Sequence, residues 1–305
     1  MKLVDVGSGA PVVIIPGIQG RWEWMNPAVN TLASRCRVVT FSLADEPTAG
    51  GRFDDAHGFD CYVEQVTDAM SSAGLTTATV VGVSYGGLIA AAFAARHAER
   101  VAGLVLVSAI PPQWTPDARV RFFLRAPTLL SPLFVLGSLR LYREIAAATP
   151  GVLPGMRAAA RHGLNALTHM FSPARMARRV HALECVQLDR ELEPVQVPTL
   201  IITGEPALDR VVPVRLTEEY ARMWPHAERM TIAHTGHLGL ITRPGEFANA
   251  VARFADRHAA QARVPVGRTL SGPPGARDPG VPAAPAPRRG VARPTLAQAT
   301  EKKVG

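Results

Sequence analysis

Six short stretches of this chain are rich in β-branched residues, and several of them are apolar at every position. They cover residues 11–15, 37–41, 79–83, 101–107, 199–203 and 228–232. Apolar runs of this length are typical of strands that are buried on both faces of a parallel sheet. Residues 1–17 also predict a short strand, a Gly-Ser-Gly turn and a second strand.

The segments between these stretches have the pattern of helices. They cover residues 26–34, 60–73, 86–96, 213–223 and 244–257. A chain in which strands and helices alternate folds as an α/β protein with helices on both faces of the sheet. The pattern therefore predicts a mostly parallel, doubly wound sheet.

The alternation stops between Ser108 and Pro198, where the pattern is helical and rich in proline and arginine. We therefore expect a helical cap, residues 111–194, inserted into a core of residues 1–110 and 195–258. From residue 259 the chain is rich in Pro, Gly and Ala, and no aromatic residue follows Phe254. Such a segment buries too little apolar surface to offset its ordering entropy, so residues 259–305 are predicted to be a disordered basic tail.

Composition narrows the class of protein. The 305 residues are 47% hydrophobic, which suffices for one large core with an insertion. The formal net charge is +8, but the predicted tail carries most of it, with eight basic residues against two acidic ones. The predicted core and cap are therefore nearly neutral together, and we expect no nucleic-acid partner.

The cysteine residues and the N-terminal sequence indicate the cellular compartment of the protein. Cys36, Cys61 and Cys185 are widely spaced and form no C-x-x-C pair, so neither a disulfide framework nor a zinc cluster is expected. Residues 1–17 lack the basic head and continuous apolar stretch of a signal peptide, and no apolar run reaches the roughly 20 residues of a membrane span. The sequence thus predicts a cytoplasmic protein without a transmembrane segment; it leaves the oligomeric state open.

A serine stands where one predicted strand meets a predicted helix, in the sequence Gly-Val-Ser84-Tyr-Gly-Gly. The pattern G-x-S-x-G at such a junction is typical of a strained turn that presents the serine hydroxyl at the end of the sheet. Small residues are required two positions on either side because the backbone is crowded there. By itself the motif also fits an ordinary turn, so the interpretation of Ser84 as a nucleophile depends on a base and an acid elsewhere.

A serine nucleophile needs a histidine base and a carboxylate that orients the base. In α/β proteins with a G-x-S-x-G turn of this kind, both follow the serine in the chain. His237, in Thr-Gly-His-Leu-Gly, follows a predicted strand and is the expected base; His234 is the alternative. Asp209 follows the predicted strand 199–203 and is the expected acid. Glu205, nearer the strand end, and Asp117 remain open as substitutes for it.

With these residues in place, the chain resembles the α/β-hydrolase superfamily over residues 3–110 and 195–257, with a helical cap between them. The resemblance rests on the segments "GVSYGG", "AARHAERVAGLVLVSA", "VPTLIITGEPALDRVVP" and "TGHLGLITRP". It implies a catalytic triad of Ser84, Asp209 and His237, with Ser84 on the sharp turn called the nucleophile elbow. It also implies an oxyanion hole formed by the backbone N–H groups of Ile18 and Tyr85.

The resemblance implies a carboxylesterase-like serine hydrolase that cleaves an ester, or a related acyl bond, of a small and largely apolar molecule through an acyl-enzyme. Trp22, Trp24 and Met25 follow the expected oxyanion loop and are candidates for lining the substrate pocket, although each could equally be a core residue. No metal or organic cofactor is expected. A lactonase, a C–C bond hydrolase or an acyltransferase could use the same triad, and a non-catalytic ligand-binding protein of this fold is a further alternative.

Overall fold

Seven strands form one sheet in the order β1-β3-β2-β4-β5-β6-β7, and only the edge strand β1 runs antiparallel to its neighbour. The structure, a computed structural model, describes residues 1–51, 53–149, 160 and 171–262. The strands are β1 (Val4–Val6), β2 (Ala10–Ile15), β3 (Cys36–Thr40), β4 (Ala78–Val83), β5 (Val101–Val107), β6 (Thr199–Thr203) and β7 (Glu228–Thr231). The predicted mostly parallel sheet is therefore confirmed, with strand ends that shift by one residue at most.

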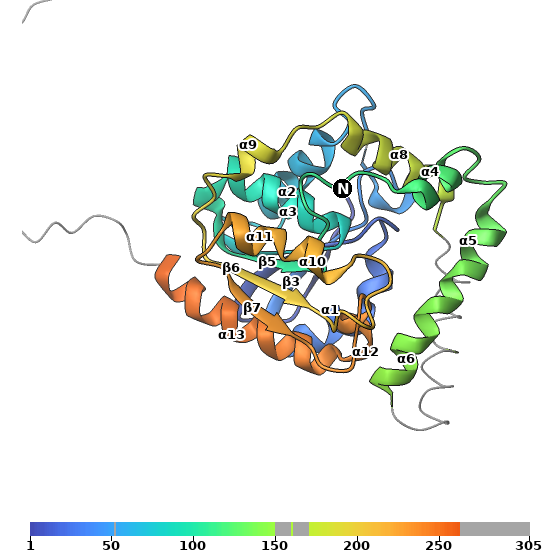
Figure 1. Cartoon of the computed structure of the whole chain (residues 1–305). Coiled ribbons are helices and arrows are strands. Elements are labelled where there is room, and N and C mark those ends of the chain that lie inside the picture. The colour runs from blue at the N-terminus through green and yellow to red at the C-terminus, as the bar shows by residue number, and fades with distance from the viewer. Residues whose placement is uncertain (52, 150–159, 161–170, 263–305) are drawn as a thin grey trace, which may run out of the picture. The chain divides into compact units, whose positions relative to one another are not determined.

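Helices cover both faces of this sheet (Figure 1). One face is covered by α2 (Asp60–Ser72), α3 (Tyr85–Arg96), α9 (Asp189–Leu192), α10 (Val214–Thr217) and α11 (Glu219–Met223). The other is covered by α1 (Asn26–Leu32), α12 (Gly239–Thr242) and α13 (Pro244–Ala262). The short 3-10 helices are η1 (Trp22–Met25), η2 (Pro47–Ala49) and η3 (Ala98–Arg100).

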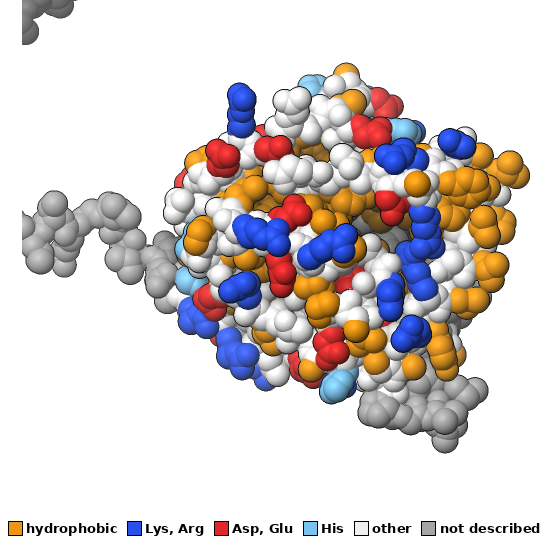
Figure 2. All heavy atoms as spheres, viewed as in Figure 1, with side chains coloured by type: hydrophobic (Ala, Val, Ile, Leu, Met, Phe, Trp, Pro, Cys, Tyr) orange, Lys and Arg blue, Asp and Glu red, His pale blue; other side chains and the backbone are white. Residues whose placement is uncertain are grey.

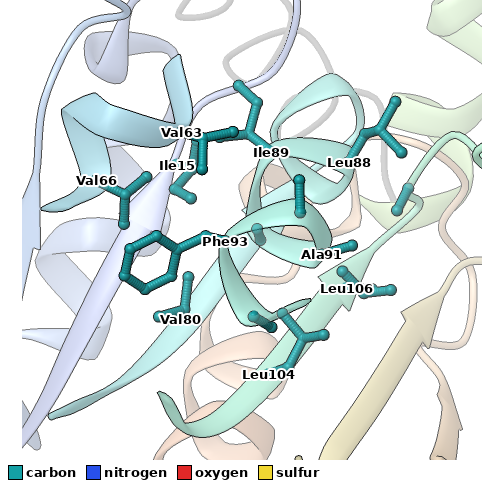
Figure 3. Close-up of a cluster of buried hydrophobic side chains, with 14 of the residues drawn as sticks. Ile15, Val63, Val66, Val80, Leu88, Ile89, Ala91, Phe93, Leu104 and Leu106 are labelled. Atoms are coloured by element: carbon teal, nitrogen blue, oxygen red, sulfur yellow. The ribbon is translucent and has the colours of Figure 1, made fainter. Parts of the chain in front are cut away.

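Helix α3 is buried along almost its whole length, because it packs on the middle of the sheet (Figure 3). Its Leu88, Ile89 and Phe93 are at most 2% exposed and share one cluster with strand residues such as Val80 and Leu104. Burying each such side chain contributes about 1.5–3 kcal/mol. This packing fixes the start of α3, and therefore Ser84, relative to the strand ends.

Two of the predicted helices differ most from the structure. The predicted helix 213–223 is divided into α10 and α11, but Glu218 between them keeps helical backbone angles, so the direction of the chain hardly changes. Helix α13 continues to Ala262, four residues beyond the predicted end of the core, and most of the predicted tail, residues 263–305, lies outside the described residues. None of the helices within the described ranges is long and apolar enough to cross a bilayer; a cytoplasmic location stays a prediction.

The segment between β5 and β6, residues 111–194, is called the insertion below. Its described helices are α4 (Ala118–Leu124), α5 (Ser131–Gly137), η4 (Ser138–Leu141), α6 (Tyr142–Ala148), α8 (Pro173–Glu184) and α9. Residues 150–159 and 161–170 of the predicted cap lie outside the described residues. Helices α4, α5 and α6 stand beside the end of the sheet to which β6 and β7 point (Figure 1).

Candidate active site

Ser84 occupies the turn between β4 and α3 with a strained backbone, φ 54° and ψ −115°. A residue with a side chain in such a conformation costs on the order of 1–3 kcal/mol, which the surrounding structure must impose. Crowding explains the glycines: a Cβ on Gly82 would lie 2.3 Å from the Gly86 carbonyl oxygen, and one on Gly86 would lie 2.5 Å from that of Pro16. The elbow predicted from G-x-S-x-G is therefore present in the backbone.

The loop of residues 16–20, which follows β2, runs beside Ser84. A Cβ on Gly17 would lie 3.5 Å from the Cβ of Ser84. The backbone N–H groups of Ile18 and Tyr85 have no acceptor in the described part of the chain. Backbone N–H groups without an acceptor are available to donate to a developing oxyanion. An oxyanion hole formed by Ile18 and Tyr85 stays a prediction.

His237 and Asp209 lie together: His237 Nδ1 is 3.4 Å from Asp209 Oδ2, and their side chains are 11% and 1% exposed. The other carboxylate oxygen, Asp209 Oδ1, accepts hydrogen bonds from the N–H groups of Val211 and Val212 at 3.0 and 2.9 Å. Burial by itself raises the pKa of Asp209, but the His237 imidazole and these two N–H groups outweigh it and hold the pKa below its ordinary value. Asp209 is thus kept ionised beside the imidazole.

The loops that carry these two residues pack backbone against backbone. A Cβ on Gly236 would lie 2.6 Å from the Asp209 nitrogen, and one on Gly204 would lie 2.5 Å from the Cα of Gly236. The Glu205 N–H also donates to the carbonyl of Thr235 at 2.7 Å. The glycine before His237, noticed in the sequence, is therefore needed for the close approach of the two loops.

The alternative base and one alternative acid contact each other instead. The N–H of His234 donates to Glu205 Oε1 at 2.7 Å, and the His234 side chain is 66% exposed. Asp117 caps the N-terminus of α4, where its Oδ1 accepts from Val120 N–H. The geometry thus favours the pair Asp209 and His237 over His234, Glu205 and Asp117.

The three residues expected to line a pocket lie in different surroundings. Met25 is buried in the hydrophobic core on the face of the sheet that α1 and α13 cover, and Trp22 packs against that same cluster. Trp24 is largely buried and its ring lies 6.2 Å from the ring of Phe171 in the insertion. Met25 is therefore a core residue, because α1 and α13 close over it, whereas Trp24 lies between the core and the insertion.

Glu144, in α6 of the insertion, was missed by sequence reasoning. Its side chain is buried, and its Oε1 accepts a hydrogen bond of 2.5 Å from the N–H of Leu238, the residue after His237. Burial raises the pKa of Glu144, and the N–H groups of Gly236 and Leu238 only partly oppose this rise. No signal in the sequence identifies Glu144, since a single glutamate in a helical pattern is typical of a solvent-facing position.

Arg179, in α8, was also missed, and it is fully buried. Its Nη1 donates to the carbonyl of Ile18 and its Nη2 to Asp45 Oδ1 and Glu46 Oε1, each at 2.6 Å. Arg175 Nε donates to the same Glu46 oxygen at 3.1 Å. We call Arg175, Arg179, Asp45 and Glu46 the arginine cluster; it ties the insertion to the 16–20 loop.

Comparisons with known proteins identify the family of this chain. A sequence model of the alpha/beta hydrolase fold matches residues 10–244. A protein of Rhizobium rhizogenes that carries the provisional name carbamate hydrolase RutD is 24% identical over 82% of this chain and 94% of its own. The pimeloyl-[acyl-carrier protein] methyl ester esterase of Vibrio vulnificus is 26% identical over 82% of this chain and 96% of its own.

A solved esterase from Exiguobacterium antarcticum superposes with a TM-score of 0.68 and 19% identity, over 83% of this chain and 94% of that one. This likeness shows a common fold. The described residues include no group of three or more His, Cys, Asp and Glu side chains arranged to hold a metal ion. The family match spans most of the core, and the chain belongs to the alpha/beta hydrolase fold family of hydrolytic enzymes.

Proposed function

We propose that this protein is a serine hydrolase that cleaves a carboxylic ester, or a related acyl bond, of a small and largely apolar substrate through an acyl-enzyme. The observation that carries the proposal is the strained backbone of Ser84 at the junction of β4 and α3. Strain of this kind persists where the surrounding structure imposes it and is frequent at active sites, and here it accompanies a buried histidine–carboxylate pair.

Each member of the triad has a distinct role. Asp209 stays ionised and faces Nδ1 of His237, which favours the tautomer with its proton on that nitrogen. Nε2 is then the atom that accepts the hydroxyl proton of Ser84. Because a serine hydroxyl is a weak nucleophile near neutral pH, this proton transfer is what activates it.

The reaction consists of two acyl transfers. Ser84 Oγ attacks the carbonyl carbon as its proton passes to His237, and the N–H groups of Ile18 and Tyr85 bind the oxyanion that forms. The intermediate collapses, the alcohol leaves with the proton from His237, and the acyl group stays on Ser84. Water then loses a proton to His237, attacks the acyl-enzyme, and the proton returns to Ser84 as the acid leaves. Each oxyanion donor contributes about 3–4 kcal/mol to such a reaction.

The surroundings of the site support a substrate with an apolar portion. Trp24 lies where the core meets the insertion, and the insertion presents an aromatic group in which the rings of Phe122, Phe123 and Phe134 lie about edge to face. We assign the insertion the role of the cap that forms one wall of the pocket. The names of the two relatives describe enzymes that act on an ester and on a carbamate, both of which have a carbonyl bonded to a heteroatom.

Labelling with a fluorophosphonate tests the nucleophile. The wild-type protein should be labelled and should hydrolyse short p-nitrophenyl esters, whereas Ser84→Ala should lose the label and at least about 10³-fold in kcat. Ser108→Ala is the matched control, because Ser108 also has positive φ and is buried after the neighbouring strand β5. It should still be labelled.

Two outcomes would overturn the proposal: a wild-type protein that neither reacts with the probe nor hydrolyses any ester, and a label that survives Ser84→Ala. A panel of esters, lactones and amides then assigns the bond type. Rates on these substrates distinguish an esterase from a lactonase that uses the same residues.

A further inference from the structure

Two arginines of the insertion, Arg119 in α4 and Arg140 in η4, lie close together. The nearest heavy atom to a Cβ built on Gly137 would be Nη2 of Arg119, at 2.9 Å, and Gly137 precedes Arg140 by three residues. Burial lowers the pKa of Arg140, and the positive charge of Arg119 lowers it further. The two guanidinium groups are therefore near enough for their like charges to repel each other.

Neither guanidinium is neutralised. Arg119 and Arg140 form no hydrogen bond or ion pair with any described residue, and Nε of Arg140 is a buried donor without an acceptor. The nearby acids are engaged elsewhere: Asp117 caps α4, and Asp209 faces His237. A buried donor without an acceptor costs about 1–3 kcal/mol, so a site that keeps one is suited to an acceptor that comes from outside the chain.

Arg140 lies on the side of its helix that faces the triad. From residue 139 to 148, positions 140, 141, 144, 145 and 148 are half-buried or buried, whereas 139, 142, 143 and 146 are exposed. Glu144, on this inner side, contacts the residue after His237, and Arg140 stands about one turn earlier. Arg140 is also near enough to Asp209 for the charge of that carboxylate to raise its pKa.

The surface agrees with this placement. Figure 2 shows basic side chains in a line between the apolar outer margin of the insertion and a hollow over the core. The apolar margin includes Leu129, Leu133, Val135, Leu136 and Leu139, all of them exposed. On the face drawn in Figure 2, basic side chains of this region therefore lie on the side nearer the core.

We propose that Arg119 and Arg140 form an anion-binding subsite of the active site, and that the natural substrate is an ester that carries a carboxylate away from the scissile bond. A guanidinium binds a carboxylate through two parallel hydrogen bonds. A single negative charge suits the pair better than a phosphate dianion, because the charges of Asp117 and Asp209 already act on Arg140. This inference rests on the proposed ester hydrolysis and defines its substrate class.

Matched esters test the subsite. Monomethyl esters of succinate, glutarate, adipate, pimelate and suberate are compared with the same esters in which the free carboxylate is a neutral amide, by following methanol release. At the best chain length, wild-type kcat/KM should favour the carboxylate by about tenfold or more, as one charge-assisted contact provides. Arg140→Gln and Arg119→Gln should each remove most of this preference, because they lower kcat/KM for the carboxylate ester far more than for its neutral counterpart.

Two further variants complete the test. Arg143→Gln is the matched control, because Arg143 is exposed on the outer side of α6, and it should keep the wild-type preference. Arg140→Lys keeps the charge but loses the two-pronged contact, so its preference should be intermediate. If Arg140→Gln does not fold, Arg119→Gln and Arg140→Lys test the subsite in its place. The proposal is overturned if both keep the wild-type preference for the carboxylate ester.

The outcomes separate this inference from the proposed function. Normal hydrolysis of the neutral esters, with no preference for a carboxylate at any chain length, overturns the anion subsite and leaves the serine hydrolase intact. Failure to hydrolyse any ester, together with absent labelling of Ser84, overturns the proposed function instead.

Discussion

The insertion buries charge against the core at two places, and it does so in opposite ways. In the arginine cluster, two guanidinium groups meet two carboxylates, and Arg179 also binds the carbonyl of Ile18. At α6, the carboxylate of Glu144 meets backbone N–H groups of the loop that carries His237 and forms no ion pair within the described part of the chain. The first contact is balanced in charge, whereas the second is not.

The difference teaches what each contact can do. A balanced buried cluster depends on all its members, because removing one leaves the others charged and without a partner. Burial without a cation raises the pKa of a carboxylate such as Glu144. Its charge, and therefore its contact with the loop, depends on pH. The first contact holds the 16–20 loop through the carbonyl of Ile18, and the second holds the loop of His237 through the N–H of Leu238.

The largest effect is expected from Arg179→Met. This change leaves Asp45 and Glu46 buried without their main cation, and breaking a buried ion pair in this way costs about 3–5 kcal/mol. Urea unfolding should show that loss. Where the variant still folds, kcat should fall because the carbonyl of Ile18 has lost its donor.

Arg178→Gln is the control for this experiment. Arg178 is the neighbouring residue of α8, but its side chain is half exposed and lies 3.6 Å from the exposed Asp55. Its removal should cost less than about 1 kcal/mol. Equal losses in the two variants would contradict the idea that burial makes the arginine cluster indispensable.

A smaller effect is expected from Glu144→Ala. The N–H of Leu238 would then be buried without an acceptor, at a cost of about 1–3 kcal/mol. Because His237 is the adjacent residue, kcat should fall while KM for a neutral ester stays nearly constant. Glu144→Gln keeps an acceptor oxygen at the same place and should recover most of kcat. A variant with alanine that retains full kcat would show that α6 does not position the histidine loop.

The smallest effect concerns pH. The pKa of Glu144 is raised on folding, so its ionised form is disfavoured in the folded protein. Its contribution to stability therefore declines as pH rises above the ordinary glutamate pKa of about 4.3. The urea concentration at the unfolding midpoint of Glu144→Gln should rise relative to that of the wild type between pH 5 and pH 8. A constant difference between the two midpoints would contradict this.

The pKa of Asp209 shifts in the opposite direction to that of Glu144, so its effect on the pH dependence of stability should be opposite as well. Its pKa is lowered in the folded protein, so its contribution to stability is present above the ordinary aspartate pKa and is lost as pH falls. In Asp209→Asn the loss of stability on acidification should be smaller than in the wild type. The same variant should lose kcat, because an amide does not stabilise the imidazolium.

Much of the core was predictable because its signals are local. Strands β5 and β6 have the predicted bounds, since their apolar runs are buried on both faces of the sheet. The strained turn at Ser84 was predictable because it admits only glycine two positions before and after the serine. In contrast, the sequence could only rank His237 above His234 and Asp209 above Glu205, because which acid faces which histidine depends on how two loops pack.

The sequence by itself determined the sheet and the strained turn at Ser84, because periodicity and glycine positions act over a few residues. Only the tertiary structure decided that Asp209 lies against His237, that Glu144 binds a backbone group 94 residues away, and that Arg179 binds the carbonyl of Ile18 across 161 residues. The insertion has no periodic signal that points to its buried polar residues, since one glutamate or arginine in a helix looks the same whether it faces water or the site. Their burial depends on where the helices of the insertion pack on the core.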